Sequence, residues 1–182
     1  MTLNKIGFKR LNDDATLPTK AHPTDSGFDL YASEDVIIEP GETEVVPTGI
    51  AVELPKGFEA QVRPRSGVTA KTKLRVQLGT IDNGYKGEIG VIVDNIRTPI
   101  KTVDVNGGRT GMSSVTTTDA YTVCGTGQYM GKRIIDGTYL IRKGDRIAQL
   151  VVQALPAVTV VEIDDFTEDS ERGEGGFGST GV

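Results

Sequence analysis

The stretch Gly144-Asp145-Arg146-Ile147-Ala148-Gln149-Leu150, continued by Val151 and Val152, places a turn directly before an apolar run. Glycine and aspartate favour a tight turn, because glycine adopts positive φ and aspartate hydrogen-bonds its own backbone. The apolar run has the length of a strand that is buried in a core. This stretch therefore predicts a turn that enters a core strand.

Similar short runs recur along the chain, and turn signals separate them. The expected further strands are Val36–Ile38, Val45–Val46, Ile50–Leu54, Glu59–Val62, Ile89–Val93 and Val158–Ile163. The turn signals are Pro40-Gly41, Pro55-Lys56-Gly57, Asn83-Gly84 and Lys143-Gly144. No window longer than about ten residues keeps a helical period, so the pattern predicts an all-β sandwich or jelly roll. One short helical turn is expected over residues 68–72, with Ser66 as its cap.

Size and composition predict one domain with additions. The 182 residues suffice for one core, and we expect a single domain over residues 1–166 and a flexible glycine-rich flap over residues 167–182. The formal charge of −5 opposes binding to a nucleic-acid backbone. The single cysteine, Cys124, cannot form an internal disulfide, which favours a reduced, cytoplasmic setting. Neither a signal peptide nor a membrane span is apparent, so we expect a soluble protein.

Residues 97–137 differ from the rest and look inserted. This stretch is rich in threonine and glycine, holds the cysteine, and interrupts a dense series of strands. Its plain interpretation is an exposed β-rich excursion without a role. Its functional interpretation is a protein-docking surface, since long loops in compact domains are often functional.

Several common chemistries find no support. Residues 125–132 resemble a phosphate loop, but Thr126 and Arg133 stand where that pattern needs glycine and serine or threonine. The G-x-G-x-x-G at 173–178 follows no strand–helix unit, so it is no dinucleotide fingerprint. His22 is the only histidine, which argues against a structural zinc and against a histidine-based triad. Catalysis, if present, should use a water activated by a carboxylate.

Five motifs remain, and each has a plain structural interpretation. Residues 25–30 form a turn leading into a strand, and residues 144–150 serve packing except at Arg146 and Gln149. R-P-R-S-G at 63–67 is either a charged turn or a phosphate seat with two guanidinium groups. Residues 79–88 form either a simple hairpin with a type I′ turn at Asn-Gly or a hairpin pocket with Asp82 and Tyr85 at its rim. Residues 172–181 are either a disordered tail or a closing flap.

In this order, the five motifs resemble those of the trimeric dUTP pyrophosphatase family. R-P-R-S-G, G-T-I-D-x-x-Y-x-G-E, G-D-R-I-A-Q and R-G-x-G-G-F-G-S-T-G are nearly intact over residues 25–181. The resemblance implies a β jelly roll, or distorted β-barrel, that assembles as a homotrimer with active sites at subunit boundaries. It also implies hydrolysis of dUTP to dUMP and pyrophosphate with Mg²⁺.

The resemblance implies roles for individual residues. Asp82 is the expected general base that directs water at the α-phosphorus, and a carboxylate is ionised at neutral pH without any special shift. Tyr85 is expected to pack under the deoxyribose and exclude a ribose. The uracil edge is expected to pair with backbone near Gln77, Gly79, Thr80 and Ile81. The hairpin would also exclude thymine and cytosine.

The phosphate chain has its own expected set. Arg65, Ser66 and Gly67 are implied to hold it, with help from Gln149. Asp29 is implied to bind a water of the Mg²⁺ ion. The tail is implied to close over the nucleotide, through Arg172, Phe177, Gly178, Ser179 and Thr180.

The sequence departs from the family at two places. Asn83-Gly84 replaces the frequent x-Asp, and residues 97–137 are longer than the usual connection. The insert resembles those of some bacteriophage-encoded members, which implies a repressor protein as a partner. Two alternatives are a nucleotide-sensing regulator that signals through the insert and a dCTP deaminase, a relative of the same fold.

Overall fold

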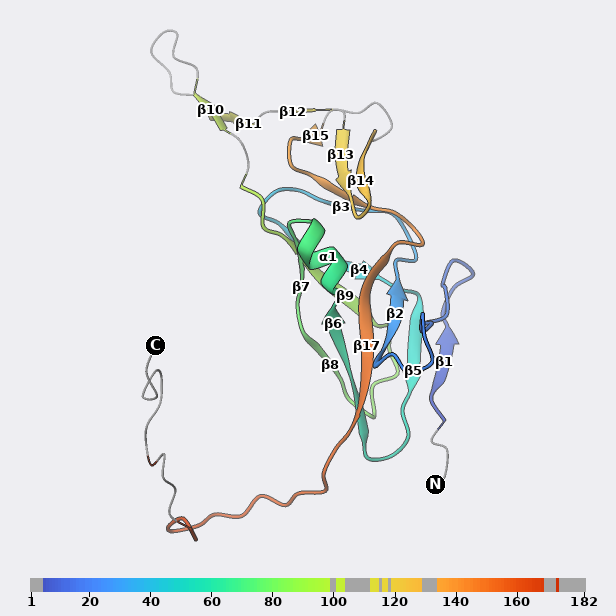
Figure 1. Ribbon diagram of the computed structural model, residues 1–182, viewed down its shortest axis with the longest axis vertical. Helices are drawn as coiled ribbons and strands as arrows, with labels where there is room; N and C mark the ends of the chain where they lie inside the picture. Colours follow the sequence, from blue (N-terminus) through green and yellow to red (C-terminus); the bar gives the residue numbers. More distant parts are fainter. Residues whose placement is uncertain are drawn as a thin grey trace.

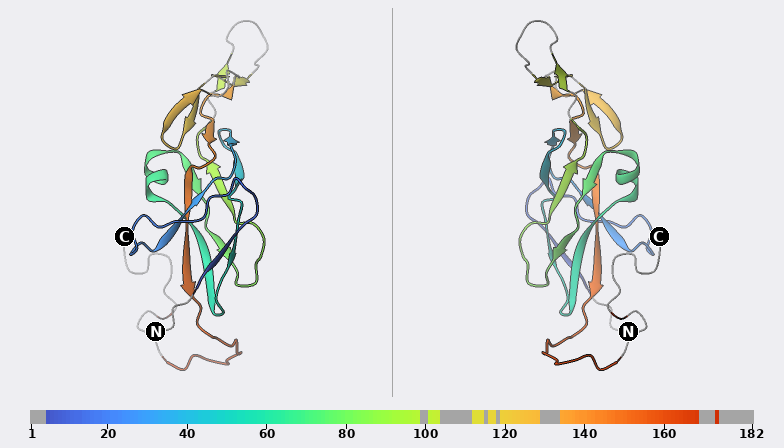
Figure 2. Two further views of the ribbon diagram at one scale, coloured as in Figure 1. Left: turned by 90° about the vertical axis from the view of Figure 1, so that its right-hand side faces the viewer. Right: turned by 90° about the vertical axis from the view of Figure 1, so that its left-hand side faces the viewer.

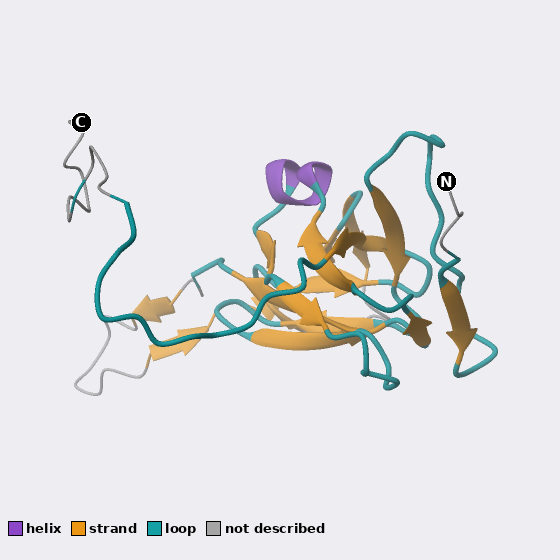
Figure 3. Ribbon diagram, turned by 90° about the horizontal axis from the view of Figure 1, so that it is seen from below, coloured by secondary structure: helices purple, strands orange, loops and turns teal. Residues whose placement is uncertain are grey.

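The computed structural model describes residues 5–98, 101–103, 112–114, 116–117, 119–128, 134–168 and 173. Among these residues the regular structure is almost entirely β-strand, and the one helix lies on the outside of the sheets (Figures 1 and 3). The elements are β1 (Gly7–Arg10), β2 (Gly27–Tyr31), β3 (Val36–Ile38), β4 (Thr43–Pro47), β5 (Ile50–Glu53), β6 (Phe58–Pro64), α1 (Ser66–Lys71), β7 (Leu74–Val76), β8 (Gly79–Ile81), β9 (Gly90–Asn95), β10 (Lys101–Val103), β11 (Met112–Ser114), β12 (Thr116–Thr117), β13 (Asp119–Thr122), β14 (Gly125–Gln128), β15 (Ile134–Ile135), β16 (Tyr139–Ile141) and β17 (Arg146–Ala154). The prediction of an all-β fold is confirmed.

Three sheets of three or four strands form most of the molecule. Their strand orders are β2-β17-β6-β8, β4-β9-β7 and β14-β13-β16-β3, and β1 pairs separately with β5. The described strands form open sheets rather than a closed barrel. One continuous cluster of buried, mostly aliphatic residues, drawn from each of these strands except β1, β13 and β14, lies between them. The remaining pairs, β10-β11 and β12-β15, lie at the far end of the elongated molecule (Figure 2).

The long strand β17 positions functional side chains. It pairs with β2 on one side and β6 on the other, both antiparallel. Ala148 and Leu150 are fully buried, whereas Gln149 is partly exposed, because successive side chains point to opposite faces. Gln149 is paired with Asp29 of β2 and with Arg63 of β6, so these three polar residues form one row on the outer face. A register shift between Arg146 and Ala148 marks a β-bulge at the entrance to the strand.

Most of the expected strands and turns are confirmed, but Val158–Ile163 is not a strand. Gly41, Gly57 and Gly144 adopt positive φ at three of the predicted turns. The Val158–Ile163 segment has no partner strand within the described chain, and Val160 is 94% exposed. Its β-branched composition favours extended backbone, but none of the described strands lies beside it to form a sheet.

Two local predictions near the motifs are also wrong. Ser66 is the first residue of α1 rather than its cap, since Arg65 occupies the N-cap position without a side-chain cap bond. The segments on either side of Asn83-Gly84 do not form a hairpin. β8 pairs with β6, whereas β9 pairs with β4 and β7, so the turn connects two different sheets. Gly84 lacks the positive φ that a type I′ turn requires.

The predicted insert is β-rich where it is described, and it is fastened to the core. β13 pairs with β16 through Tyr121 and Tyr139, which extends the sheet that contains β3. Buried Asn95 joins the two parts, because its Nδ2 donates to the carbonyls of Ile38 (3.0 Å) and Gly137 (2.9 Å). The base of the insert is therefore continuous with the core. The one described helix, α1, is far too short to cross a membrane.

Candidate functional site

A first pocket, of about 250 Å³, lies where β8 ends and β9 begins. Its lining includes the β8 residues Gly79, Thr80 and Ile81, then Asp82, Tyr85 and Glu88 of the connection, with Val62, Gly90 and Ile92. β8 is an edge strand, paired on one side only. Its outer backbone N–H and C=O groups can therefore bind a ligand edge.

The connection that carries Asp82 is held in place by polar contacts. The Tyr85 N–H donates to the Asp82 carbonyl (3.0 Å) and closes a turn. Asn83 Nδ2 lies near the carbonyls of Leu54 (3.3 Å), Pro55 (2.8 Å) and Phe58 (3.2 Å). Asp82 itself is exposed at the rim. The turn thus presents a carboxylate to the pocket from a fixed backbone.

Tyr85 forms one wall of this pocket. Its hydroxyl donates to the Glu88 carbonyl (2.8 Å), which fixes the direction of the ring. A Cβ on Gly87 would lie 2.5 Å from that hydroxyl, so the ring can lie this close only because residue 87 is glycine. Glu88 in turn accepts a hydrogen bond from the Gly49 N–H (2.6 Å). These contacts together hold the Tyr85 ring against the pocket.

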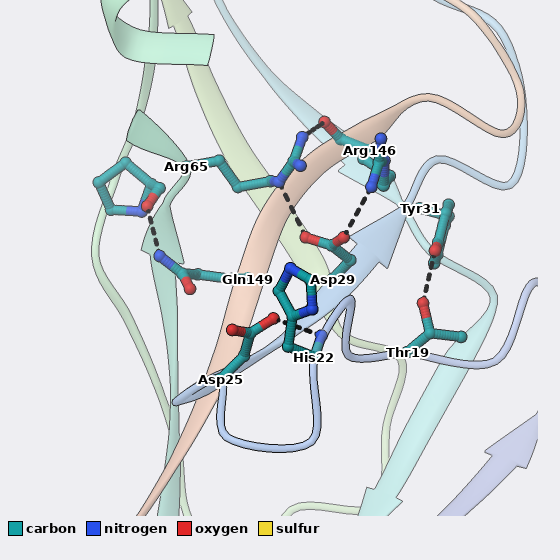
Figure 4. A network of polar contacts seen from close by, with 9 residues as sticks. Thr19, His22, Asp25, Asp29, Tyr31, Arg65, Arg146 and Gln149 are labelled. Atoms are coloured by element: carbon teal, nitrogen blue, oxygen red, sulfur yellow. Dashed lines mark hydrogen bonds and ion pairs between the residues drawn. The ribbon is translucent and has the colours of Figure 1, made fainter. Parts of the chain in front are cut away.

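A second cleft, of about 370 Å³, lies over the polar row of β17. It is lined by Ala21, Asp25, Ser26, Gly27, Asp29, Arg65, Arg146 and Gln149. Asp29 lies between two cations: its Oδ1 is 2.9 Å from Arg65 Nε, and its Oδ2 is 3.2 Å from Arg146 Nη1 (Figure 4). Arg65 Nη1 also donates to the Arg146 carbonyl (3.0 Å). The carboxylate therefore orients both guanidinium groups along the cleft.

Gln149 lies beside this pair of arginines. Its Nε2 donates to the Pro64 carbonyl (3.0 Å), which leaves the amide oxygen on the side of Gly27. A Cβ on Gly27 would lie 2.3 Å from that oxygen. The Gln149 side chain can therefore lie this close to β2 only because residue 27 is glycine.

The structure divides the predicted site residues between these two places. Asp29, Arg65 and Gln149 line the cleft, whereas Gly79, Thr80, Ile81, Asp82 and Tyr85 line the pocket. Ser66 and Gly67 are exposed in the first turn of α1, directly after Arg65. Within the described part of the chain, no residue lines both places. Arg172, Phe177, Gly178, Ser179 and Thr180 lie outside the described residues.

Gln77 lies apart from both places. Its backbone N–H donates to the Ile92 carbonyl (3.0 Å), and its side chain contacts Asp94. Conversely, Asp25 and Ser26 line the cleft although the sequence gave them no site role, and Arg146, which it named beside Gln149 without assigning it a contact, lines the cleft as well. The signal for Arg146 was its position in the same motif as Gln149. For Asp25 and Ser26 it was their position in the motif that contains Asp29.

The cleft suits a metal that arrives with its ligand. Among the described residues, no group of three His, Cys, Asp or Glu side chains lies close enough to hold an ion. The cleft contributes the carboxylates of Asp29 and Asp25, and Asp25 Oδ2 also accepts a bond from the His22 N–H (2.8 Å). Mg²⁺ usually keeps several waters and binds through one or two carboxylates and substrate phosphates. The donor set fits that mode.

Comparison with known proteins gives consistent matches along the chain. The sequence model of the dUTPase family matches residues 13–109 and 136–181. A deoxyuridine 5′-triphosphate nucleotidohydrolase of Clostridioides difficile is 38% identical over 175 residues, which are 95% of each chain. An alignment of this length includes most of residues 97–137, so relatives with a segment here are not confined to phages.

Two solved phage structures are also similar. The dUTPase of Staphylococcus bacteriophage 80alpha with dUpNHpp, described as controlling the transfer of virulence genes by a G protein-like mechanism, is 34% identical with a TM-score of 0.85. The match covers 99% of this chain and 100% of the phage chain. The dUTPase of phage phi11 of S. aureus, in which a species-specific insert was visualised, is 30% identical with a TM-score of 0.79. That match covers 91% of this chain and 100% of the other.

Proposed function

We propose a residue-level mechanism for this chain, which belongs to the dUTPase family and hydrolyses dUTP to dUMP and pyrophosphate. Asp82 accepts a proton from the attacking water, and the water oxygen attacks the α-phosphorus. The observation that carries this assignment is the exposed Asp82 carboxylate at the rim of a pocket walled by a fixed tyrosine ring. A general base must lie within hydrogen-bond reach of the water that it activates.

Deoxyuridine specificity comes from the first pocket. The free edge of β8 offers backbone donors and acceptors at Gly79, Thr80 and Ile81 for the uracil edge. Tyr85 packs against the deoxyribose and leaves no room for a 2′-hydroxyl, because its ring is fixed by Glu88. Selection thus rests on backbone geometry and steric exclusion. Gln77 lies outside the pocket and supports β9, because its backbone N–H donates to the Ile92 carbonyl.

The triphosphate lies in the second cleft. Arg65 and Gln149 contact its oxygens, and the exposed Ser66 and Gly67 extend the contact along the start of α1. Mg²⁺, when bound with the nucleotide, neutralises phosphate charge and polarises the α-phosphorus. Asp29 would hold it through a water. The same carboxylate keeps Arg65 and Arg146 aligned in the absence of ligand.

We infer that the catalytic unit is a homotrimer with its sites at subunit boundaries. One chain holds the pocket and the cleft apart, with no shared lining residue, so a neighbouring copy can bring one to the other. The exposed apolar residues of the extended segment support an assembly, because Val158, Val160, Val161 and Phe166 are each at least 70% exposed. Monomeric proteins rarely leave such a cluster uncovered. The tail beyond it, with Arg172, Phe177, Gly178, Ser179 and Thr180, would close over the nucleotide.

Pyrophosphate release tests this proposal. We expect activity with dUTP and Mg²⁺, and none with UTP, dTTP or dCTP. Asp82→Asn should lose turnover by orders of magnitude while it still binds dUpNHpp, since the carboxamide keeps the shape and removes the base. Full activity of Asp82→Asn would refute the assigned base. Release of ammonia from dCTP would revive the deaminase alternative, which the family match does not favour.

A second proposal concerns the region 97–137. The similarity to the 80alpha dUTPase, with its reported control of gene transfer, supports a role as a docking surface for a repressor protein. A chain that lacks residues 97–137 should keep hydrolysis and lose the partner. Unchanged binding of every partner after the deletion would contradict this role. The cytoplasm remains the predicted location.

A further inference from the structure

A third pocket lies between the insert, residues 97–137, and the rest of the protein. It has a volume of about 530 Å³ and is lined by Lys71, Arg97, Tyr121, Thr122, Val123, Cys124, Gly125 and Tyr139. This lining shares no residue with the nucleoside pocket or the phosphate cleft. It includes two cations and no acidic residue, although the whole chain carries a net charge of −5. The pocket is therefore a local positive region on an acidic protein.

Arg97 is fixed in this pocket with donor capacity to spare. Its guanidinium carbon lies 3.7 Å from the ring centroid of Tyr121 and 5.5 Å from that of Tyr139. Its backbone N–H donates to Asn95 Oδ1 (3.1 Å), and the Nε is buried without a hydrogen-bond acceptor among the described residues. A buried donor without an acceptor is costly, so such groups usually have a partner. The Nε is closed to solvent in this structure, so a ligand with acceptor oxygens would contact Arg97 through its terminal Nη groups.

Lys71 contributes the second charge from the last turn of α1. The carbonyls around that helix end already have a donor, because Arg75 Nη1, which carries two hydrogens, lies within hydrogen-bond distance of the carbonyls of Thr69 (3.2 Å), Thr72 (3.2 Å) and Leu74 (2.7 Å). Lys71 is exposed and forms no ion pair with any described carboxylate. Its ammonium is therefore available to a ligand in the pocket.

We propose that this pocket is a second anion site, separate from catalysis, that binds a phosphate or diphosphate group. A planar guanidinium and an ammonium together suit an anion with several acceptor oxygens. The Thr122 hydroxyl also lines the pocket; it accepts from the Cys124 N–H (3.3 Å) and retains its own proton to donate to a ligand. Pyrophosphate, the product of the reaction, belongs to this class of ligand and is the probe for the test.

Cys124 provides a local readout, because it is exposed, lines the pocket and is the only cysteine in the chain. The experiment measures the rate at which this thiol reacts with dithiobis-nitrobenzoate, at increasing pyrophosphate and constant ionic strength. We expect pyrophosphate to slow the reaction in a saturable manner. In Lys71→Gln, the pyrophosphate concentration for half-protection should rise about two- to fivefold, the range expected for one exposed ion pair. Lys71 is the better target than Arg97, since Lys71 is exposed whereas the Arg97 guanidinium lies over the rings of Tyr121 and Tyr139.

Two control variants separate this site from others. Lys56→Gln removes an exposed lysine from a distant turn and should leave protection unchanged. Arg65→Ala removes a phosphate contact of the catalytic cleft, and protection of Cys124 should persist in it. The proposal is wrong if pyrophosphate protects no more than chloride at equal ionic strength. It is also wrong if Lys71→Gln is protected like the wild type, or if Arg65→Ala abolishes protection.

Discussion

Replacing Asn83 by alanine tests how the catalytic turn is held. The side-chain amide lies within 2.8–3.3 Å of the carbonyls of Leu54, Pro55 and Phe58, and it has two hydrogens to donate. Two net hydrogen bonds contribute about 1–3 kcal/mol. We expect Asn83→Ala to lower the free energy of unfolding by that amount. Urea denaturation at one fixed protein concentration measures it, since assembly makes stability depend on concentration.

The same substitution should reduce turnover more than substrate affinity. The turn that Asn83 fastens to the β5–β6 connection carries Asp82, and a misplacement of a catalytic group by about 1 Å can reduce the rate by about 100-fold. We expect kcat to fall by about 10- to 100-fold in the pyrophosphate-release assay. Asn83→Asp keeps the shape but cannot donate, so it should behave similarly. Lys86→Ala, at an exposed neighbour, is the matched control. Wild-type kcat and wild-type stability in Asn83→Ala would refute the reasoning.

Further predictions concern the phosphate cleft. Asp29→Asn leaves two guanidinium groups without a compensating charge, so unfolding by urea should show a loss of about 1–3 kcal/mol. An unchanged urea midpoint would mean that the two ion pairs are not stabilising. Gly27→Ala should displace the Gln149 amide and raise the KM for dUTP about two- to tenfold, the equivalent of one hydrogen bond, in steady-state kinetics. Gly84→Ala, where a methyl group meets nothing within 4 Å, should leave KM unchanged, and an equal rise in both variants would argue against the steric cause.

The strands that sequence predicted correctly are those whose local pattern and long-range partners agree. Ile147–Val152 is apolar and β-prone, and β17 has a partner strand on each side. Val158–Ile163 has the same local character and no partner strand in the described chain. Composition reports the preference of a segment for extended backbone, but only the rest of the fold decides whether another strand lies beside it.

The site shows a similar division. The motifs identified the chemical groups, such as Asp82, Tyr85 and Arg65, because residue type and order are properties of sequence. Sequence could not show that Asn83-Gly84 connects two sheets instead of closing a hairpin, since that depends on which strands β8 and β9 pair with. Nor could it show that Arg146 shares the Asp29 carboxylate, because the bulge in β17 sets that contact.

The short helix α1 connects two of the places described above. Its six residues span about 9 Å. Ser66, at its start, follows Arg65 of the phosphate cleft, and Lys71, at its end, lines the pocket at the insert. Just after α1, the Lys73 N–H donates to the Tyr139 hydroxyl (2.9 Å), and the Lys73 carbonyl accepts from the Ile96 N–H (3.0 Å). The helix therefore places the phosphate cleft and the pocket at the insert at opposite ends of one short element.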